Sequence, residues 1–365
     1  MQFTIILTGT DPKTRKGGIG HALPGYLAAL NSANISFISI PTYNPENRKG
    51  KYFLWLKQLP KIFFISRELK KSGKQPIIYS HAGAGVSLIR QFFVLLVGKL
   101  AGAKTMLQLH ALEVNKYLDS TIIRLFLKSF LWQPADIILV LTPWWKDRLK
   151  KADINKNIEV ISNPISNFLY RKVMPPPLKD KFKRKEKITI LTMTRLEKGK
   201  GVDIVIKAIQ YLPQTVDLVI AGDGTQRKML EHLVSVLKLK NRVQFLGWVK
   251  GNEKYRILEK SDIFCLPSTL DSFGMGFVEA MAFGLPIVAV KWGPIADVVP
   301  DGIAGILVEK PDPKLIAQAL LQFVNPEERY KFGQAGKKWV LQQFSPEKIG
   351  EKLRKIIDNL VVAEE

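Results

Sequence analysis

Short apolar runs alternate with longer amphipathic stretches along the first 161 residues. The runs predict strands near 2–8, 35–40, 76–80, 104–109, 137–141 and 158–161, and the stretches between them predict helices near 22–31, 52–72, 85–100, 120–132 and 143–151. This alternation is typical of βα units around a parallel sheet. We therefore expect an α/β protein whose first part is a doubly wound, Rossmann-like domain.

Residues 171–187 interrupt the alternation with three consecutive prolines and a run of lysines, a composition typical of a linker. Further strands are predicted near 187–193, 216–220, 243–246, 262–266, 286–290 and 305–308. The expected organisation is a Rossmann-like domain at 1–175, a second one at 186–344, and a terminal helix within 345–365 that packs back toward the first domain. The cleft between the two domains is the expected ligand site.

The composition excludes several classes of protein. Apolar residues make up 46% of the 365 residues and aromatic residues 10%, which excludes a disordered or collagen-like chain. The single cysteine, Cys265, excludes an internal disulfide and favours a reducing compartment. The first residues predict a buried strand rather than a signal peptide, and no apolar run approaches the roughly 20 residues that span a bilayer. We therefore expect a cytoplasmic protein.

The charge indicates an anionic partner. The formal net charge is +23, with +16 in residues 1–180 and +7 in residues 181–365. Phosphate backbones of nucleic acids and anionic membrane surfaces both attract such a domain. No helix-turn-helix, zinc-finger or aromatic RNA-binding pattern occurs in the sequence, so no nucleic-acid partner is expected.

Two segments of the first domain suit a membrane surface. Residues 51–74 mix Lys and Arg with Trp and Phe, and residues 87–100 are strongly apolar with basic ends. Such segments bind anionic leaflets, although their apolar faces could equally be buried in the core of the domain. Pro60 argues against one uninterrupted helix through the first segment. Peripheral association with the inner face of the membrane is one hypothesis.

The most informative stretch for chemistry is PSTLDSFGMGFVEAMAFGLPIVAV, residues 267–290. A loop with Asp271 follows a predicted strand, and a helix then begins and runs through Glu279. A helix N-terminus beside glycines offers free amides and the positive end of the helix dipole, which favour phosphates and polyhydroxylated anions. A purely structural explanation also exists, with Phe273 and Met275 in the core, Gly274 in a turn and Glu279 solvated.

The spacing PS-x2-acid-x-FG-x4-EAMA-x-G-x-P in this stretch resembles the E-x7-E signature of glycosyltransferase family 4, whose members are retaining sugar-nucleotide transferases of the GT-B fold. Other segments resemble the family in the same order along the chain: TRLEKGKGVD at 194–203, AGDG at 221–224, VQFLGWV at 243–249, DGIAGILV at 301–308 and FSPEKIGEKL at 344–353. The resemblance thus covers nearly the whole chain.

This resemblance implies the roles of several residues. Arg195 and Lys200 would hold the diphosphate of the donor, where negative charge grows as the nucleotide leaves. Glu279 would bind the ribose hydroxyls. Asp271, together with the amides of Phe273, Gly274 and Met275, would bind the donor sugar. Family members usually carry Glu at the position of Asp271, so the sugar preference of this chain is open.

Two further features of the first domain resemble the family. Gly17 and Gly18 resemble its glycine loop, which places backbone amides beside the donor phosphate, although a plain strand-to-helix turn has the same sequence. His110 follows a predicted strand, at a position where the resemblance implies a histidine that contacts the donor sugar. A lone histidine there is otherwise more often structural.

The expected activity is transfer of a sugar, with retention, from a nucleotide-sugar to a hydroxyl of a glycan or lipid-linked acceptor in the synthesis of a surface polysaccharide or glycolipid. No Asp-x-Asp occurs in the sequence, so no metal and no other cofactor is expected. The alternatives are a sugar-nucleotide epimerase or phosphorylase, or a non-catalytic protein that binds nucleotide sugars or nucleic acid.

Overall fold

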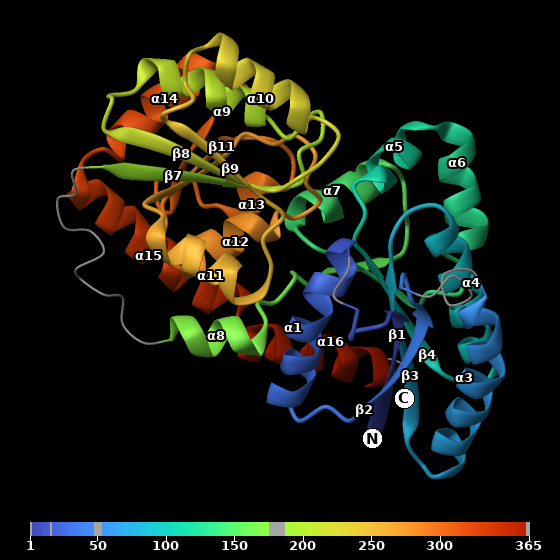
Figure 1. Cartoon of the computed structure of the whole chain (residues 1–365). Coiled ribbons are helices and arrows are strands. Elements are labelled where there is room, and N and C mark those ends of the chain that lie inside the picture. The colour runs from blue at the N-terminus through green and yellow to red at the C-terminus, as the bar shows by residue number, and fades with distance from the viewer. Residues whose placement is uncertain (1, 15–16, 47–52, 175–186, 363–365) are drawn as a thin grey trace. The chain divides into compact units, whose positions relative to one another are not determined.

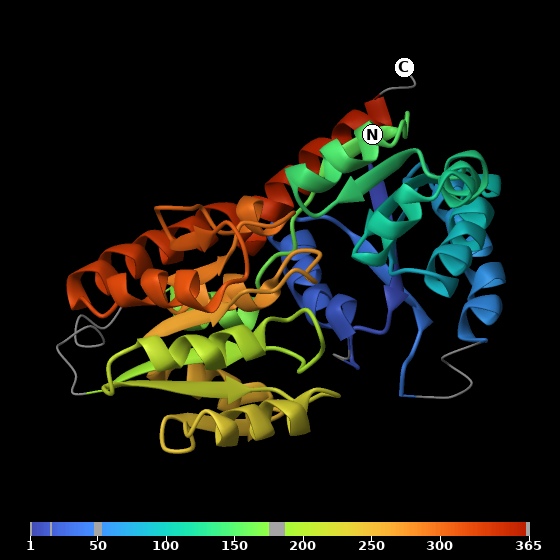
Figure 2. The ribbon, with the colours of Figure 1, turned by 90° about the horizontal axis from the view of Figure 1, so that it is seen from above.

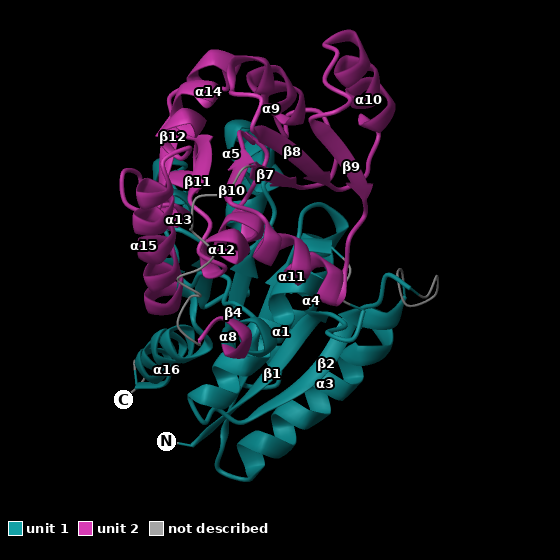
Figure 3. Ribbon diagram, turned by 60° about the vertical axis from the view of Figure 1, so that its left-hand side comes forward, with its two compact units in different colours: residues 1–170, 344–365 teal, residues 171–343 magenta. Residues whose placement is uncertain are grey.

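The computed structural model describes residues 2–14, 17–46, 53–174 and 187–362. The chain divides into two compact units: unit 1 comprises residues 1–170 and 344–365, and unit 2 comprises residues 171–343 (Figure 3). The division precedes the expected boundary at 175 by five residues. Most of the predicted linker, residues 175–186, lies outside the described residues.

Unit 1 is built on a six-stranded parallel sheet. Its strands are β1 (Phe3–Thr10), β2 (Phe37–Tyr43), β3 (Gln75–Ala82), β4 (Lys104–Leu109), β5 (Ile137–Val140) and β6 (Asn157–Val160), in the order β2-β1-β3-β4-β5-β6. Its helices are α1 (Gly17–Ser32), α3 (Leu54–Lys71), α4 (Val86–Leu100), α5 (Glu113–Asp119), α6 (Thr121–Phe126), a π-helical segment (Leu127–Leu131), α7 (Pro143–Lys151) and α16 (Pro346–Val362). The helix α8 (Asn167–Val173) crosses the division between the units.

Unit 2 repeats this plan with β7 (Ile188–Met193), β8 (Val216–Ala221), β9 (Val243–Gly247), β10 (Ile263–Leu266), β11 (Ile287–Val290) and β12 (Gly305–Val308), in the order β12-β11-β10-β7-β8-β9. Its helices are α9 (Val202–Ala208), α10 (Arg227–Val236), α11 (Gly251–Lys260), α12 (Met275–Ala282), α13 (Ile295–Val298), α14 (Pro313–Gln322) and α15 (Pro326–Phe344), with a 3₁₀ turn at Ile209–Tyr211. The two parallel sheets with flanking helices confirm the predicted α/β class with two Rossmann-like domains.

Helices cover both faces of the unit 1 sheet. Figures 1 and 2 both show α1 on one side of the strands and α3 and α4 on the other. Buried residues of α1 and α16 share one core with β1, β3 and β4, and α16 contributes Ile349, Leu353 and Ile357 to it. The last helix of the chain is therefore part of the core of unit 1.

Two glycine-rich or proline-containing segments differ from the sequence-based expectation. Helix α1 begins at Gly17, where φ is +72°, so Gly17 and Gly18 open the helix instead of preceding it. Helix α3 continues through Pro60, so the expected interruption there is wrong. Proline cannot donate to the carbonyl of Leu56, but both residues are exposed and water can satisfy that carbonyl.

A buried polar network crosses the unit 1 sheet at the ends of β3 and β4. The Nδ1 atom of His81 lies 2.9 Å from Nε2 of His110, and both rings are buried. The Tyr26 ring meets His81 edge-on, and its hydroxyl donates to Oδ1 of Asn163 at 3.1 Å. Burial lowers the pKa of His110 to about 3, and burial together with His110 lowers the pKa of His81 well below its ordinary value. Both imidazoles are therefore neutral at physiological pH.

The pH dependence of stability tests this neutrality. An imidazole in the unfolded chain titrates near pH 6.5. Below that pH the unfolded chain therefore binds a proton that the buried ring of the folded protein does not bind, and this lowers the free energy of unfolding. Between pH 7 and pH 5, His110 alone should lower the free energy of unfolding by about 2 kcal/mol. In thermal or urea unfolding, the free energy of unfolding of His110→Gln should fall less between pH 7 and pH 5 than that of wild type. The control His232→Gln, at an exposed position on α10, should keep the wild-type slope, and equal slopes for all three proteins would contradict burial of a neutral His110.

A second prediction concerns the contact between α1 and α16. A Cβ atom on Gly350 would lie 2.4 Å from the carbonyl oxygen of Ala29 and 2.8 Å from the hydroxyl of Ser32. Glycine to alanine normally stabilises a helix by about 1 kcal/mol. Gly350→Ala should instead destabilise unit 1 by about 1 to 3 kcal/mol, because the helices must separate. Gly18→Ala, where no atom lies within 4 Å, is the matched control and should not lower the melting temperature. A melting temperature for Gly350→Ala at or above wild type would contradict the close contact.

Candidate functional site

The strand order of unit 2 places its candidate residues at the point where the order reverses. Counted from β7, the six strands follow the Rossmann order 3-2-1-4-5-6, and the reversal lies between β7 and β10. Ligands of such sheets bind outside the carboxyl ends of the strands at this point. The loop after β7 carries Arg195 and Lys200, and the loop after β10 carries Asp271.

Glycines let these loops approach each other closely. Gly201 has φ +71°, and a Cβ atom there would lie 2.5 Å from the carbonyl oxygen of Pro267. A Cβ atom on Gly222 would lie 1.8 Å from the carbonyl oxygen of Thr194. The backbone amide of Thr269 donates to the carbonyl of Gly199 at 3.1 Å, which ties the loops after β7 and β10 together. The KGKG segment, residues 198–201, thus packs the loops together, whether or not it also binds a ligand.

Lys200 and Asp271 form an ion pair across these loops. The ammonium of Lys200 donates to Oδ1 of Asp271 at 2.9 Å and to the carbonyl of Leu270 at 2.8 Å. Only 9% of the Lys200 side chain is exposed. The other carboxylate oxygen of Asp271, Oδ2, is buried and has no hydrogen-bond partner. A buried acceptor without a hydrogen-bond donor destabilises the folded protein. This oxygen is therefore suited to accept a hydrogen bond from a hydroxyl group of a ligand.

Helix α12 begins directly after this pair. Its first residue is Met275, and Gly274 before it has φ +84°, in the left-handed region. Phe273 is buried, which anchors the turn to the core of unit 2. The first amides of α12 and the positive end of its dipole are therefore held at the switch point, where an anion would be stabilised.

Glu279 lies further along α12 and pairs with a residue that the sequence did not single out. The ammonium of Lys254 on α11 donates to Oε1 of Glu279 at 2.5 Å, and the Glu279 side chain is 15% exposed. The structure therefore corrects the interpretation of Glu279 as a solvated residue. No local pattern links two residues 25 positions apart, so sequence reasoning had no signal for Lys254.

Arg195 lies two residues beyond the end of β7 and is exposed. Its neighbour Leu196 is fixed by hydrogen bonds with the loop after β8: the Leu196 amide donates to the Asp223 carbonyl at 2.9 Å, and the Leu196 carbonyl accepts from the amide of Gln226. The backbone that carries Arg195 is thus anchored while its guanidinium faces solvent.

The structure brings together only some of the predicted site residues. Arg195, Lys200, Asp271, Phe273–Met275 and Glu279 share the switch-point edge of unit 2. His110, Gly17 and Gly18 belong to unit 1, where His110 follows β4 and the glycines are exposed at the start of α1. His81, the ring partner of His110, was not identified from the sequence.

Within the described ranges, no three side chains from His, Cys, Asp and Glu gather as ligands for a metal ion. The one cysteine, Cys265, is buried in β10, and burial raises the pKa of its thiol. Lys200, Arg195 and the start of α12 place positive charge at the switch point.

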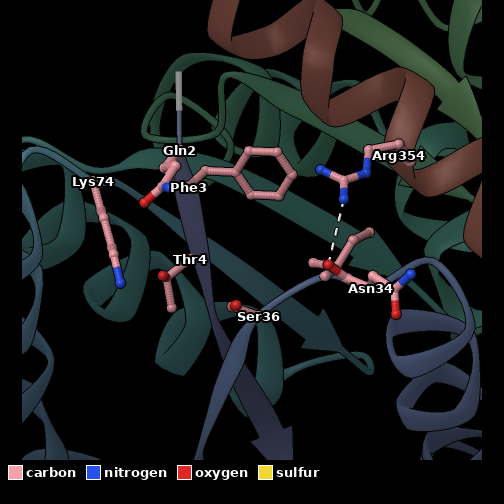
Figure 4. A pocket seen from close by; sticks show the side chains of 8 residues that line it. Gln2, Phe3, Thr4, Asn34, Ser36, Lys74 and Arg354 are labelled. Atoms are coloured by element: carbon pink, nitrogen blue, oxygen red, sulfur yellow. Dashed lines mark hydrogen bonds between the residues drawn. The ribbon is translucent and has the colours of Figure 1, made fainter.

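A hollow of about 430 Å³ lies elsewhere, in unit 1 (Figure 4). Phe3, Asn34, Lys74 and Arg354 are among its lining residues, at the amino-terminal side of β1 and β2. Arg354 donates to the carbonyl of Ala33 at 3.2 Å and lies over the Phe3 ring, 5.0 Å from its centroid. Its guanidinium is committed to structural contacts, and the amino ends of parallel strands are not the usual ligand edge. We therefore place the candidate site at the switch point of unit 2.

Comparisons with known proteins show what the chain is similar to. Residues 177–339 match the sequence family described as Glycosyl transferases group 1. N-acetyl-alpha-D-glucosaminyl L-malate synthase of Bacillus anthracis is 33% identical over 199 residues, which are 53% of this chain and 52% of that protein. One of the subunits of human phosphatidylinositol N-acetylglucosaminyltransferase is 27% identical over 67% of this chain and 49% of the human protein. The matched regions thus span about half the length of these relatives.

A solved structure resembles the whole chain. The crystal structure of Anabaena HepE in complex with UDP has a TM-score of 0.72, covers 98% of this chain and 100% of its own, and is 18% identical. This likeness confirms the predicted GT-B fold class. Residues 177–339, which make up nearly all of unit 2, are thus similar to the group 1 glycosyl transferases.

Proposed function

We propose that this chain is a glycosyltransferase that moves a sugar from a nucleotide-sugar donor to a hydroxyl of a glycan or lipid-linked acceptor. The observation that carries the proposal is the Lys200–Asp271 pair at the start of α12, where a cation, helix amides and an unpartnered carboxylate oxygen meet. A leaving nucleoside diphosphate gains negative charge in the transition state, and fixed positive charge held there stabilises it.

Each side chain has a distinct proposed task. Lys200 donates two of its three N–H groups within the protein. The third would donate to a phosphate oxygen of the nucleotide sugar, and Arg195 would bind the same diphosphate. Glu279 would accept from the ribose hydroxyls, held in orientation by Lys254. Asp271 Oδ2 would accept from a sugar hydroxyl, and the amides at Gly274 and Met275 would donate to the sugar or phosphate.

We also propose that the reaction proceeds with retention and without a metal. Lys200, Arg195 and the α12 amides supply the positive charge that a divalent ion supplies elsewhere. The resemblance to glycosyltransferase family 4 implies that the leaving phosphate itself would take the proton of the incoming hydroxyl, and we propose this route for the chain. His110 from unit 1 would contact the donor sugar as a neutral hydrogen-bonding ring.

The acceptor proposal includes lipid-linked glycans and work at the inner face of a membrane. It is supported by the basic charge of residues 1–180 and by the human relative, whose name contains phosphatidylinositol. No helix in the described part of the chain has both the length and the apolar character that a membrane crossing requires.

Nucleotide binding gives the sharpest test of the donor site. The test is a thermal-shift panel of UDP, GDP, ADP and a set of nucleotide sugars, without added metal. At least one of these ligands should raise the melting temperature, because it binds only the folded protein. UDP is the first candidate, since it occupies the HepE structure. Lys200→Ala should abolish that shift and reduce kcat/KM on the order of 100-fold. Lys198→Ala, an exposed lysine of the same loop, is the charge-matched control and should bind normally.

A loss of folding must be separated from a loss of binding, because Lys200→Ala leaves Asp271 without its partner. The double variant Lys200→Ala with Asp271→Ala removes both charges and should recover stability without recovering turnover. Glu279→Ala should also weaken nucleotide binding. Wild-type turnover in Lys200→Ala and Glu279→Ala together with a normal fold would sink the proposed function.

Product analysis tests the chemistry. Proton NMR of the first product should show the anomeric configuration of the donor, and excess chelator should leave the initial rate unchanged within about twofold. An inverted product or a rate restored only by a divalent ion would overturn the retaining or the metal-independent proposal. Formation of a new sugar nucleotide without any acceptor would instead favour an epimerase.

A further inference from the structure

One face of unit 1 exposes large apolar side chains on three neighbouring helical elements: α3, α4, and α6 with the π-helical segment that continues it. Figure 1 shows α3, α4 and α6 along one side of unit 1. Val86, Ile89, Phe93 and Leu100 of α4, with Ile122 and Phe126 of α6, are exposed members of this set, which we call the apolar face.

Helix α4 has two apolar sides. One side, with Leu88, Val94 and Leu95, is buried against the sheet. The exposed side repeats at i, i+3, i+7 and i+14, from Val86 to Leu100, and these two residues are 68% and 69% exposed. A helix that is apolar on all sides is normally buried on all sides. We therefore expect a binding partner to cover the outward side of α4.

Helix α6 has the sequence TIIRLF and none of its residues is buried. Ile122 is 81% exposed and Phe126 is 50% exposed. Leaving such side chains in water costs about 1.5 to 3 kcal/mol each relative to burial. Packing within unit 1 does not explain these residues, because α6 is held to the rest mainly through α5 and the π-helical segment, its direct neighbours along the chain.

Aromatic rings join the helices into one continuous surface. The Trp55 ring stacks on Phe93 at 5.5 Å between centroids, Phe92 stacks on Phe130 at 4.5 Å, and Phe130 stacks on Phe126 at 5.4 Å. Phe92 and Phe93 also meet edge-on at 5.1 Å. The contacts therefore run without a break from α3 across α4 to α6, so the apolar face is one connected patch rather than scattered residues.

Charge identifies the partner that would cover this face. Between residues 53 and 131 there are 12 Lys and Arg against 3 Asp and Glu. Lys57 and Lys61 are exposed on α3 close to Leu56 and Phe64, and residues 120–131 contain no acidic side chain. A second copy of this chain would bring like charges together, which opposes association. Apolar side chains bordered by exposed lysines match the acyl and headgroup layers of an anionic bilayer.

We infer that the apolar face is a docking surface for an anionic lipid bilayer, with Ile122 and Phe126 of α6 in the interfacial layer and the lysines of α3 at the phosphates. This surface lies wholly in unit 1 and its binding does not require the donor site of unit 2. The inference rests on the proposed work at the inner face of a membrane, but it stands or falls separately from the proposed donor site.

Vesicle sedimentation of the full-length protein tests the inference. Wild type should sediment with phosphatidylcholine vesicles that contain phosphatidylglycerol, much less with phosphatidylcholine alone, and less at high salt. The double variant Ile122→Ser with Phe126→Ser should reduce partitioning at least about tenfold. Because no residue of α6 is buried, this variant should keep the wild-type circular dichroism and lose only the small stability that the Phe126–Phe130 contact supplies.

Matched variants separate the face from apolar exposure in general. Met229→Ser with Val236→Ser removes two exposed apolar side chains from α10 of unit 2 and should leave partitioning unchanged. Lys57→Gln with Lys61→Gln should reduce binding to the anionic vesicles only. Nucleotide thermal shifts should be the same in all these variants, which keeps the donor site as an independent readout.

The inference is overturned if wild type does not bind the anionic vesicles, or if the α10 variant loses as much binding as the α6 variant. It is also overturned if light scattering without lipid finds a wild-type dimer that the α6 variant dissociates, since the face would then be an interface between copies.

Discussion

Every strand in each sheet runs parallel to its neighbours, and this constraint decides where the chemistry of the chain can lie. All carboxyl ends of one sheet meet at one edge, and in unit 2 the strand order also reverses between β7 and β10. Lys200 and Asp271, 71 residues apart, come within hydrogen-bond distance for this reason. The same crowding leaves no room for a Cβ atom at Gly201 or Gly222. Only 9% of the Lys200 side chain and 21% of the Asp271 side chain are exposed, and burial of this kind strengthens an ion pair. Packing of the loops and electrostatics of the site therefore have a common cause.

Much of the fold could be predicted from the sequence because its elements are set by local patterns. Each of the predicted strands occurs within three residues of its expected bounds, since buried parallel strands are short, β-branched runs. The expected break at Pro60 is wrong because the helix is exposed there, which pattern alone does not reveal, and water can reach the freed carbonyl of Leu56. Helices α5 and α8 are seven residues each and too short for a periodic signal.

The site could be predicted only in part, for a related reason. Asp271, Glu279 and Lys200 stand in recognisable motifs, whereas Lys254 and His81 stand in none and reach their partners by tertiary contact. Nothing in the residue type of Lys254 distinguishes it from the other surface lysines of so basic a chain. Its pairing with Glu279 follows from the packing of α11 beside α12, which no local sequence pattern encodes.

The two-sided apolar character of α4 shows where sequence reasoning reaches its limit. Residues 87–100 could be interpreted as core or as a membrane-facing segment, and the apolar side chains of this helix do divide into a buried side and an exposed side. The spacing of apolar residues along the sequence cannot tell the buried side of α4 from its exposed side. The position of the sheet decides which side is covered. The outward side of α4 lies near α6, none of whose residues is buried. Exposed apolar side chains that gather in one place mark a contact with something outside the protein, and this is the basis of the proposed bilayer contact.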